Sequence, residues 1–412
     1  MSEASLWRDR DVRLVIGGQA VSAVGDAVSF TAFPLLVLAL TGSGAAMGIV
    51  GVLGTLPDLL IGLPAGAWAD RWDRRRTIIL ADLGRALLTA LIPLSAIVGW
   101  DTMTVLLLVT FPINALRVLF MSAWTASIPM LVGTDRVARA QGVIEAIFSL
   151  SFIVGPVLAG LLVATIGPVA TIGGDALSFV ASAVAMSLVR RRLQRERTAE
   201  PRHLVREIGD GVGYLVRQPV LRMAVLFWSC VTVVTAPLVP AIIFLLDQER
   251  GADPSATGLI LSGWGIGWLV GALVAGRLAN RRAGLLMLAS NALTSLVVIA
   301  FVTVQEPVVM AALSAVAGAL GAVGLIPYVT LRATITPNEM LGRVGSTARV
   351  LTLGLQPVGL FFGGLALDAF GGAPTILVVG LIGAGLSGIF VWSRPLRTAR
   401  IPRPAAPAVP AV

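Results

Sequence analysis

Long apolar stretches separated by short arginine-bearing segments dominate this sequence. A helix that crosses a bilayer needs about 20 mainly apolar residues, and twelve stretches of that kind occur here. They lie near residues 14–40, 45–68, 77–99, 103–131, 140–165, 168–189, 220–246, 255–279, 284–304, 307–331, 344–367 and 373–393. The sequence therefore predicts an all-α integral membrane protein with twelve transmembrane helices.

The composition supports this fold class and excludes several kinds of chemistry. The chain is 56% hydrophobic and 13% charged, whereas soluble proteins contain about 25% charged residues. All 31 basic residues are arginine, so a phosphate-binding loop, which requires a lysine, cannot form. Cys230 and His203 are the single cysteine and histidine, which excludes an intrachain disulfide and a Cys/His zinc cluster. We therefore expect no cofactor and no metal.

The arginines predict how the chain is oriented. If both termini are cytoplasmic, 25 arginines fall in inner segments and Arg250 alone falls in an outer one. Because basic residues favour the cytoplasmic side, we expect a multi-pass protein of the inner (plasma) membrane with both termini inside. The net charge of +9 comes from these loops, so we expect lipid rather than nucleic acid as a partner. The first apolar stretch is too long for a signal-peptide core and should remain as helix 1.

Charge and composition also divide the chain into four parts. We predict an N-terminal six-helix half (1–189), a cytoplasmic linker (190–219), a C-terminal six-helix half (220–394) and a disordered Pro/Ala-rich tail (395–412). Within the linker, apolar residues recur at helical spacing and predict an amphipathic helix at the inner surface: Leu204, Ile208, Val212 and Leu215. For residues 190–200 an irregular charged linker is an equal alternative.

The two halves are pseudo-repeats. Residues 65–71 align with residues 275–281 at an offset of 210, which also pairs Gly48 with Gly258. A second register pairs residues 159–161 with residues 363–365, and Gly167 with Gly371. Duplicated six-helix halves predict a central site between them.

A short charged turn separates the second and third apolar stretches, over residues 66–76. Its order resembles the G-x-L-A-D-R-x-G-R-R signature between helices 2 and 3 of the major facilitator superfamily of secondary transporters. The matching residues form the predicted gating turn: Gly66, Asp70, Arg71, Arg74 and Arg75. Trp68 and Asp73 replace the usual Leu and Gly, which predicts a stiffer turn. A simple orientation signal is the alternative role. The resemblance covers about residues 10–394.

The fifth apolar stretch carries a second motif. Gly142, Ser151, Gly155, Pro156, Ala159 and Gly160 resemble the G-x8-G-x3-G-P-x-x-G-G motif in helix 5 of exporting members, with Ser151 and Ala159 in place of two glycines. Small residues allow close helix approach and proline allows bending. The resemblance favours export over uptake, with ordinary helix packing as the alternative.

Three ionisable residues lie deepest within the apolar stretches: Asp26, Asp58 and Arg117. A charge in mid-membrane is costly and is a functional hypothesis by default. In the family that this chain resembles, helices 1, 4, 7 and 10 line the cavity. Asp26 is therefore the first candidate for the proton carrier, with a structural ion pair to Arg117 as the alternative. Asp58 is the second candidate and could instead cap amides beside Pro57.

Four further ionisable residues receive structural interpretations. Asp82 and Arg85 are predicted to form a local pair that supports the turn at Asp70. Glu145 is expected to pair with a nearby arginine, and Asp175 is expected to reach the headgroups from the outer end of helix 6.

Further fragments indicate a branch of the superfamily. Gly25-Asp26, Thr41-Gly42-Ser43 and residues 340–344 resemble the enterobactin and macrolide exporters. The resemblance implies a monomeric secondary active transporter, not an enzyme, that exports a small amphiphilic compound in exchange for protons. Two alternatives remain: uptake or uniport of a metabolite by the same fold, and a non-transporting membrane sensor or scaffold.

The repeat predicts an asymmetric inner gate, because Asp70 corresponds to Asn280. A carboxylate near a helix amino terminus contributes about 0.3–1 kcal/mol, which a neutral amide does not match. We expect Asp70→Asn to reduce the transport rate more than Asn280→Asp does. Equal losses in a transport assay would contradict the asymmetry.

Overall fold

The computed structural model describes residues 6–191, 193–194, 204–278 and 282–401. The regular secondary structure of these residues is helical. The N-terminal half contains α1 (Arg10–Thr41), α2 (Gly44–Leu60), α3 (Gly62–Arg71), α4 (Arg74–Val98), α5 (Thr102–Val132) and α6 (Val137–Ser187). The C-terminal half contains α8 (Pro219–Thr235), α9 (Leu238–Phe244), a π-helical turn (Leu245–Glu249), α10 (Pro254–Leu278), α11 (Ala283–Thr303), α12 (Pro307–Ile335), α13 (Leu341–Leu353), α14 (Gln356–Phe370) and α15 (Gly372–Phe390).

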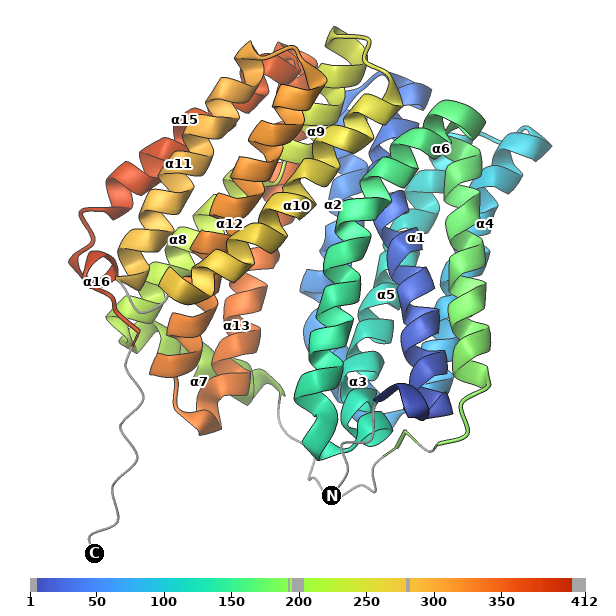
Figure 1. Cartoon of the computed structure of the whole chain (residues 1–412), viewed down its shortest axis with the longest axis horizontal. Coiled ribbons are helices and arrows are strands. Elements are labelled where there is room, and N and C mark those ends of the chain that lie inside the picture. The colour runs from blue at the N-terminus through green and yellow to red at the C-terminus, as the bar shows by residue number, and fades with distance from the viewer. Residues whose placement is uncertain (1–5, 192, 195–203, 279–281, 402–412) are drawn as a thin grey trace, which may run out of the picture.

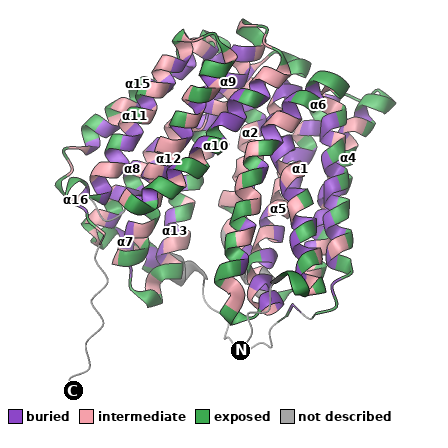
Figure 2. Ribbon diagram, in the orientation of Figure 1, coloured by how far each residue is buried: buried purple, intermediate pink, exposed green. Residues whose placement is uncertain are grey.

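The described helices have the length and composition of a multi-pass membrane protein. Ten helical segments are long and apolar enough to span a bilayer, and Gly44–Leu60 is a shorter apolar helix. The longest segment, Thr134–Ser187, contains two spans because α6 turns back at Gly167, where φ is 81°. This arrangement is compatible with the twelve predicted helices. Buried residues lie along the middle of each bundle and exposed residues on its outward faces (Figure 2).

The two bundles approach each other at one end only (Figure 1). We name this the closed end, where α1 ends and α2 begins. The largest hydrophobic cluster lies there and joins both halves, with Leu36 and Met47 from one and Ile243 and Ile376 from the other. At the opposite, open end, where α1 begins, each half has a separate apolar cluster. The halves are therefore in contact at the closed end and separate at the open end.

Glycines allow close backbone contacts across the closed end. A Cβ added at Gly48 on α2 would lie 2.7 Å from the Leu360 carbonyl oxygen and 3.0 Å from the Cα of Gly364 on α14. A Cβ added at Gly160 on α6 would lie 3.2 Å from the Cα of Gly258 on α10. The two contacts correspond to each other through the internal repeat, because its registers equate Gly48 with Gly258 and Gly160 with Gly364. The interface is therefore pseudo-symmetric.

The same registers equate the sharp turns at Gly167 and Gly371. Both glycines have a positive φ, 81° and 85°, with an extended ψ. A side chain rarely adopts this conformation, so both tight reversals between spans require glycine.

One carboxylate ties the halves together at the closed end. Asp368 at the end of α14 accepts hydrogen bonds from the Gly44 amide (2.5 Å), the Ala45 amide (3.1 Å) and the Ser43 hydroxyl (2.8 Å). These amides belong to the first turn of α2, where amide groups lack partners within the helix. A residue of one half therefore caps a helix of the other half.

The segments outside the two bundles only partly follow the sequence prediction. The predicted amphipathic helix is present as α7 (Leu204–Arg217), and its Asp210 pairs with Arg343 of α13 at 3.0 Å. The prediction of a disordered tail was wrong for residues 395–401. Leu396, in α16 (Arg394–Arg397), is fully buried, and the Ala399 carbonyl accepts from the Gly284 amide at 3.4 Å. Residues 402–412 lie outside the described part of the chain.

We expect Asp368→Ala to favour opening of the closed end. Loss of a side chain that caps a helix costs about 0.5–2 kcal/mol, which corresponds to a shift of about two- to thirtyfold in the population of conformers. Spin labels placed at Trp100 and Gln305, in loops of opposite halves, would report the change as a longer distance. The labels require Cys230→Ser to remove the native free thiol.

Asp253→Ala is the matched control. Asp253 accepts from the Ser255 amide at 2.8 Å, next to the start of α10 and within one half. It should leave the distance between the labels unchanged. If both substitutions lengthen it equally, the contact across the halves has no special role.

Candidate coupling site and gate

A buried cluster of ionisable side chains lies within the N-terminal half. Arg85 on α4 is 2% exposed and pairs directly with Asp26 on α1. The guanidinium lies over the Phe179 ring of α6 at 3.8 Å from its centroid, and its Nη1 is 3.8 Å from the carboxylate of Asp82. Asp26 is 37% exposed, whereas Asp82 is fully buried. Asp26 is thus the one carboxyl of these two that is not buried by the protein.

Asp175 of α6 completes this group, which we call the Arg85 cluster (Asp26, Asp82, Arg85 and Asp175). It is buried and accepts from the hydroxyls of Ser29 on α1 (2.5 Å) and Ser178 on α6 (2.8 Å). The prediction that Asp175 reaches the headgroups was therefore wrong. It lies eight residues beyond the turn at Gly167, which is about 12 Å along a helix.

Gly25 makes room for Asp175. A Cβ at position 25 would lie 2.8 Å from the Cβ of Ser178 and would come even closer to a carboxylate oxygen of Asp175. The glycine therefore lets α6 place its carboxyl against the backbone of α1, next to Asp26.

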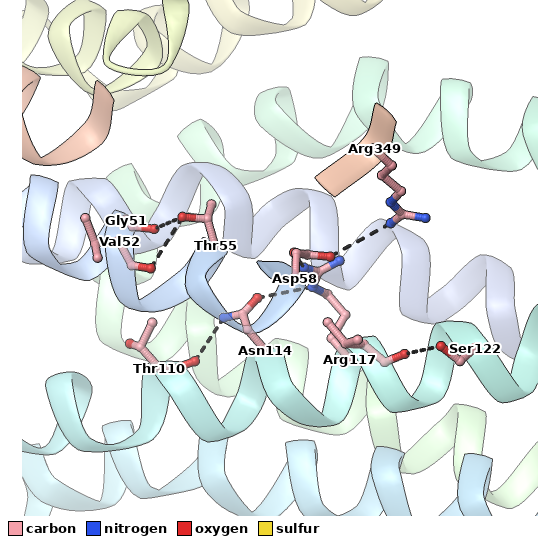
Figure 3. A network of polar contacts seen from close by, with 10 residues as sticks. Gly51, Val52, Thr55, Asp58, Thr110, Asn114, Arg117, Ser122 and Arg349 are labelled. Atoms are coloured by element: carbon pink, nitrogen blue, oxygen red, sulfur yellow. Dashed lines mark hydrogen bonds and ion pairs between the residues drawn. The ribbon is translucent and has the colours of Figure 1, made fainter. Parts of the chain in front are cut away.

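A second polar cluster lies on α2, α5 and α13 (Figure 3). Asp58 pairs with Arg117 of α5 at 2.5 Å and with Arg349 of α13 at 3.8 Å. The Arg117 Nε donates to the Asn114 side-chain oxygen at 3.1 Å. Arg349 belongs to the C-terminal half and is 69% exposed. The carboxylate of Asp58 therefore connects the two halves.

These pairings differ from the predicted ones. Arg85, not Arg117, is the partner of Asp26, and Arg117 pairs with Asp58. Asp82 and Arg85 do approach each other, but the guanidinium reaches beyond α4 to α1. Glu145, which was expected to pair with an arginine, accepts a hydrogen bond from the side-chain Nε2 of Gln141 at 3.1 Å.

The predicted gating turn ties helices together within the N-terminal half. Arg74 donates to the Ala126 carbonyl of α5 at 2.8 Å, and Arg75 donates to the Met186 and Ser187 carbonyls at the end of α6. Cations favour helix carboxyl ends, where carbonyls lack partners. Arg71 is exposed. Gly66 and Asp70 lie in α3, but their side-chain surroundings are outside the described part, as is Asn280.

Asp73, which replaces the usual glycine, has a local role. Its carboxylate accepts from the Arg76 amide at 2.8 Å and caps α4.

The predicted export motif places α6 against two neighbours. Gly155 abuts Ala27 of α1, where an added Cβ would lie 2.9 Å from the carbonyl carbon. Pro156 and Gly160 abut Gly258 of α10 in the other half. Gly142, nearer the open end, has no atom within 4 Å of a Cβ built on it. The motif therefore contributes to the closed end in this conformation.

Sequence reasoning missed the roles of Arg85, Asp82, Asp175, Arg349 and Asp368. A count of residues from the turn at Gly167 could have indicated the depth of Asp175. The partners of Arg85 and Arg349 come from helices distant in the sequence, and no local pattern identifies them.

The fold and both clusters define a membrane transport protein with two pseudo-symmetric halves. The family model described as "transmembrane secretion effector", of the major facilitator superfamily, matches residues 6–399. The chain belongs to this family.

Relatives in sequence and structure agree with the assignment. "Multidrug efflux pump Tap" of Mycolicibacterium fortuitum is 30% identical over 89% of this chain and 92% of its own length. "Macrolide efflux protein A" of Streptococcus pyogenes is 28% identical over 48% of this chain and 49% of its own. An inward-facing, unoccupied bacterial homologue of the lysosomal transporter Spinster has the same fold, with a TM-score of 0.74, 14% identity and coverage of 99% and 100%.

The tight contact at Gly25 generates a test of the Arg85 cluster. We expect Gly25→Ala to destabilise the protein by about 1–3 kcal/mol, because the added methyl displaces Asp175 in a close-packed core. The measurement is the thermal unfolding midpoint of the purified protein in detergent. Gly17→Ala, also on α1 but with nothing within 4 Å, is the matched control and should be neutral or stabilising. Equal midpoints for the two variants would contradict the packing role.

Proposed function

We propose that this protein exports a small amphiphilic compound from the cytoplasm in exchange for protons. Membership of a secretion effector family and the efflux relatives support export. The observation that carries the proposal of proton coupling is the ion pair of Asp26 and Arg85 within spanning helices, in which the Asp26 side chain is only partly covered by the protein.

The arrangement of the halves defines the state of the proposed cycle. The open end carries the arginine-rich loops, and basic loops favour the cytoplasm. We therefore infer that the open end faces inward and that both termini are cytoplasmic. We further propose that the protein resides in the inner (plasma) membrane as a monomer. The contacts of Asp368 and of the paired glycines close the opposite side.

Arg85 provides a route from protonation to helix movement. In this conformation an ionised Asp26 pairs with Arg85, and Asp82 is the next carboxyl, 3.8 Å from the guanidinium. A proton taken up by Asp26 removes its charge, so Arg85 loses its ionised partner. Loss of this ion pair weakens the contact between α1 and α4, and a proton that binds the two conformations unequally shifts the population between them.

Asp58 provides a second connection, this time between the halves. It pairs with Arg117 in its own half and with Arg349 in the other. Movement of α13 away from α2 separates Arg349 from Asp58 and leaves the pair with Arg117 intact. The ion pair between Asp58 and Arg349 therefore forms only when the two bundles are close at this point, and it stabilises that relative position.

The test is paired transport and binding in the Asp26→Asn variant. Asparagine mimics the protonated acid, so we expect the variant to bind a radiolabelled macrolide in detergent but to lose its accumulation in proteoliposomes driven by a pH gradient. Asp101→Asn is the control, because Asp101 lies in an exposed loop, where hydrogen bonds from Thr104 hold its pKa below the usual range. It should transport normally.

Two results would overturn the proposal. If Asp26→Asn still accumulates the macrolide with normal dependence on pH, Asp26 is not the proton carrier and Asp58 becomes the next candidate. If the native protein accumulates neither the macrolide nor any compound from a growth-inhibition panel, the proposed export is wrong.

A further inference from the structure

The Arg85 cluster contains more carboxyl groups than its cation can balance. We propose that Asp82 and Asp175 each hold a proton at neutral pH in this conformation, while Asp26 stays ionised against Arg85. The N-terminal half thus contains a site for two protons in addition to the exchange site at Asp26. This inference deepens the proposed proton exchange, but it can be tested without a transported substrate.

The first step of the argument is the charge balance. The charged groups that face Asp82 and Asp175 from α1 and α4 are Asp26 and Arg85. Arg117, on the neighbouring α5, pairs with Asp58. If all three carboxyls were ionised, the cluster would carry a net charge of −2 inside a membrane-spanning bundle. An uncompensated carboxylate away from water costs several kcal/mol, and such groups take up a proton instead.

The second step identifies the carboxyl that remains ionised. Asp26 pairs directly with the guanidinium, so this partner stabilises its charge. One guanidinium compensates one carboxylate. The other two carboxyls are left without a full counter-charge.

The third step concerns Asp82, which is 0% exposed. Neither of its oxygens has a hydrogen-bond partner within normal geometry among the described residues, although Ser182 of α6 lies near it. Arg85 approaches no closer than 3.8 Å in the ion pair that joins them. A buried charged carboxylate with so few hydrogen-bond partners is unfavourable. The neutral acid loses less free energy when its hydrogen bonds are missing.

The fourth step concerns Asp175, whose two oxygens are bonded to the hydroxyls of Ser29 and Ser178. A hydroxyl both donates and accepts, so a protonated Asp175 keeps both contacts by donating to one serine. The backbone at Gly25 lies against the carboxyl, and the side chain is 4% exposed. Asp175 therefore has neither a cation of its own nor access to bulk water.

The second cluster provides a contrast within the same half. Asp58 faces two arginines, Arg117 and Arg349, and its charge is fully compensated. It should be ionised, so Asp58→Asn is the matched control for the removal of a membrane-embedded carboxyl.

The experiment is infrared spectroscopy of the full-length protein in lipid at neutral pH. A protonated carboxylic acid has a carbonyl stretching band that an ionised carboxylate lacks, and the band shifts in deuterated water. We expect Asp82→Asn and Asp175→Asn each to remove part of this band, the double variant to remove both parts, and Asp58→Asn to leave it unchanged. Circular dichroism confirms that each variant is folded.

The native protein provides a measurement that does not depend on any variant. Labelling of the aspartate carboxyls with carbon-13 should shift the band, because the proposed protons lie on aspartates. Absence of a shift, an unchanged band in both single variants, or loss in only one of them would overturn the assignment of two protons. An intact band with no transport would instead contradict the proposed function and leave this inference standing.

Discussion

A single guanidinium, that of Arg85, organises the N-terminal half. It is almost fully buried, and its contacts come from three helices: Asp26 on α1, Asp82 on its own α4 and the Phe179 ring on α6. A buried charge is costly unless it is paired, so the packing of these helices depends on keeping the carboxyls in place. Gly25 leaves space for Asp175 beside the Asp26–Arg85 pair. The hydroxyls of Ser29 and Ser178 hydrogen-bond to the Asp175 carboxyl there, so no second cation is needed to hold it in place.

The two halves share an architecture but not a charge distribution. Glycine pairs related by the internal repeat meet at the closed end, which is why that interface is nearly symmetric. The Arg85 cluster belongs to the N-terminal half, whereas Asp368, which caps α2 across the closed end, belongs to the C-terminal half. In the C-terminal half, Asp253 forms its hydrogen bond with Ser255 beside the start of α10, whereas α2 takes part of its cap from the opposite half. The internal repeat therefore accounts for the similar architecture of the halves, whereas their ionisable side chains differ in place and in partners.

Much of the fold could be predicted because hydrophobic length and small-residue spacing are local properties. The apolar stretches located the spans, and Gly167 and Gly371 fall in gaps between predicted spans. The repeat registers equated Gly48 with Gly258 and Gly160 with Gly364, but the contacts of these glycines across the halves appear only in the structure. The site was predicted only in part. Asp26, Asp58 and Arg117 were identified by depth, but one sequence does not show how each helix is rotated about its axis. The partner of Asp26 was therefore assigned to Arg117, although Arg85 is the residue that faces it.

The glycine contacts at the closed end have a mechanical consequence. Where backbones touch directly, as at Gly48 with Gly364 and at Gly160 with Gly258, no long side chain is threaded into a pocket of the other half. Separation there requires no change of rotamer and leaves no emptied hole, unlike the separation of interlocked apolar side chains. At these two backbone contacts the halves can separate without rearranging side chains, so resistance to opening lies in the polar contacts of Asp368 and in the apolar cluster that joins the halves at the closed end.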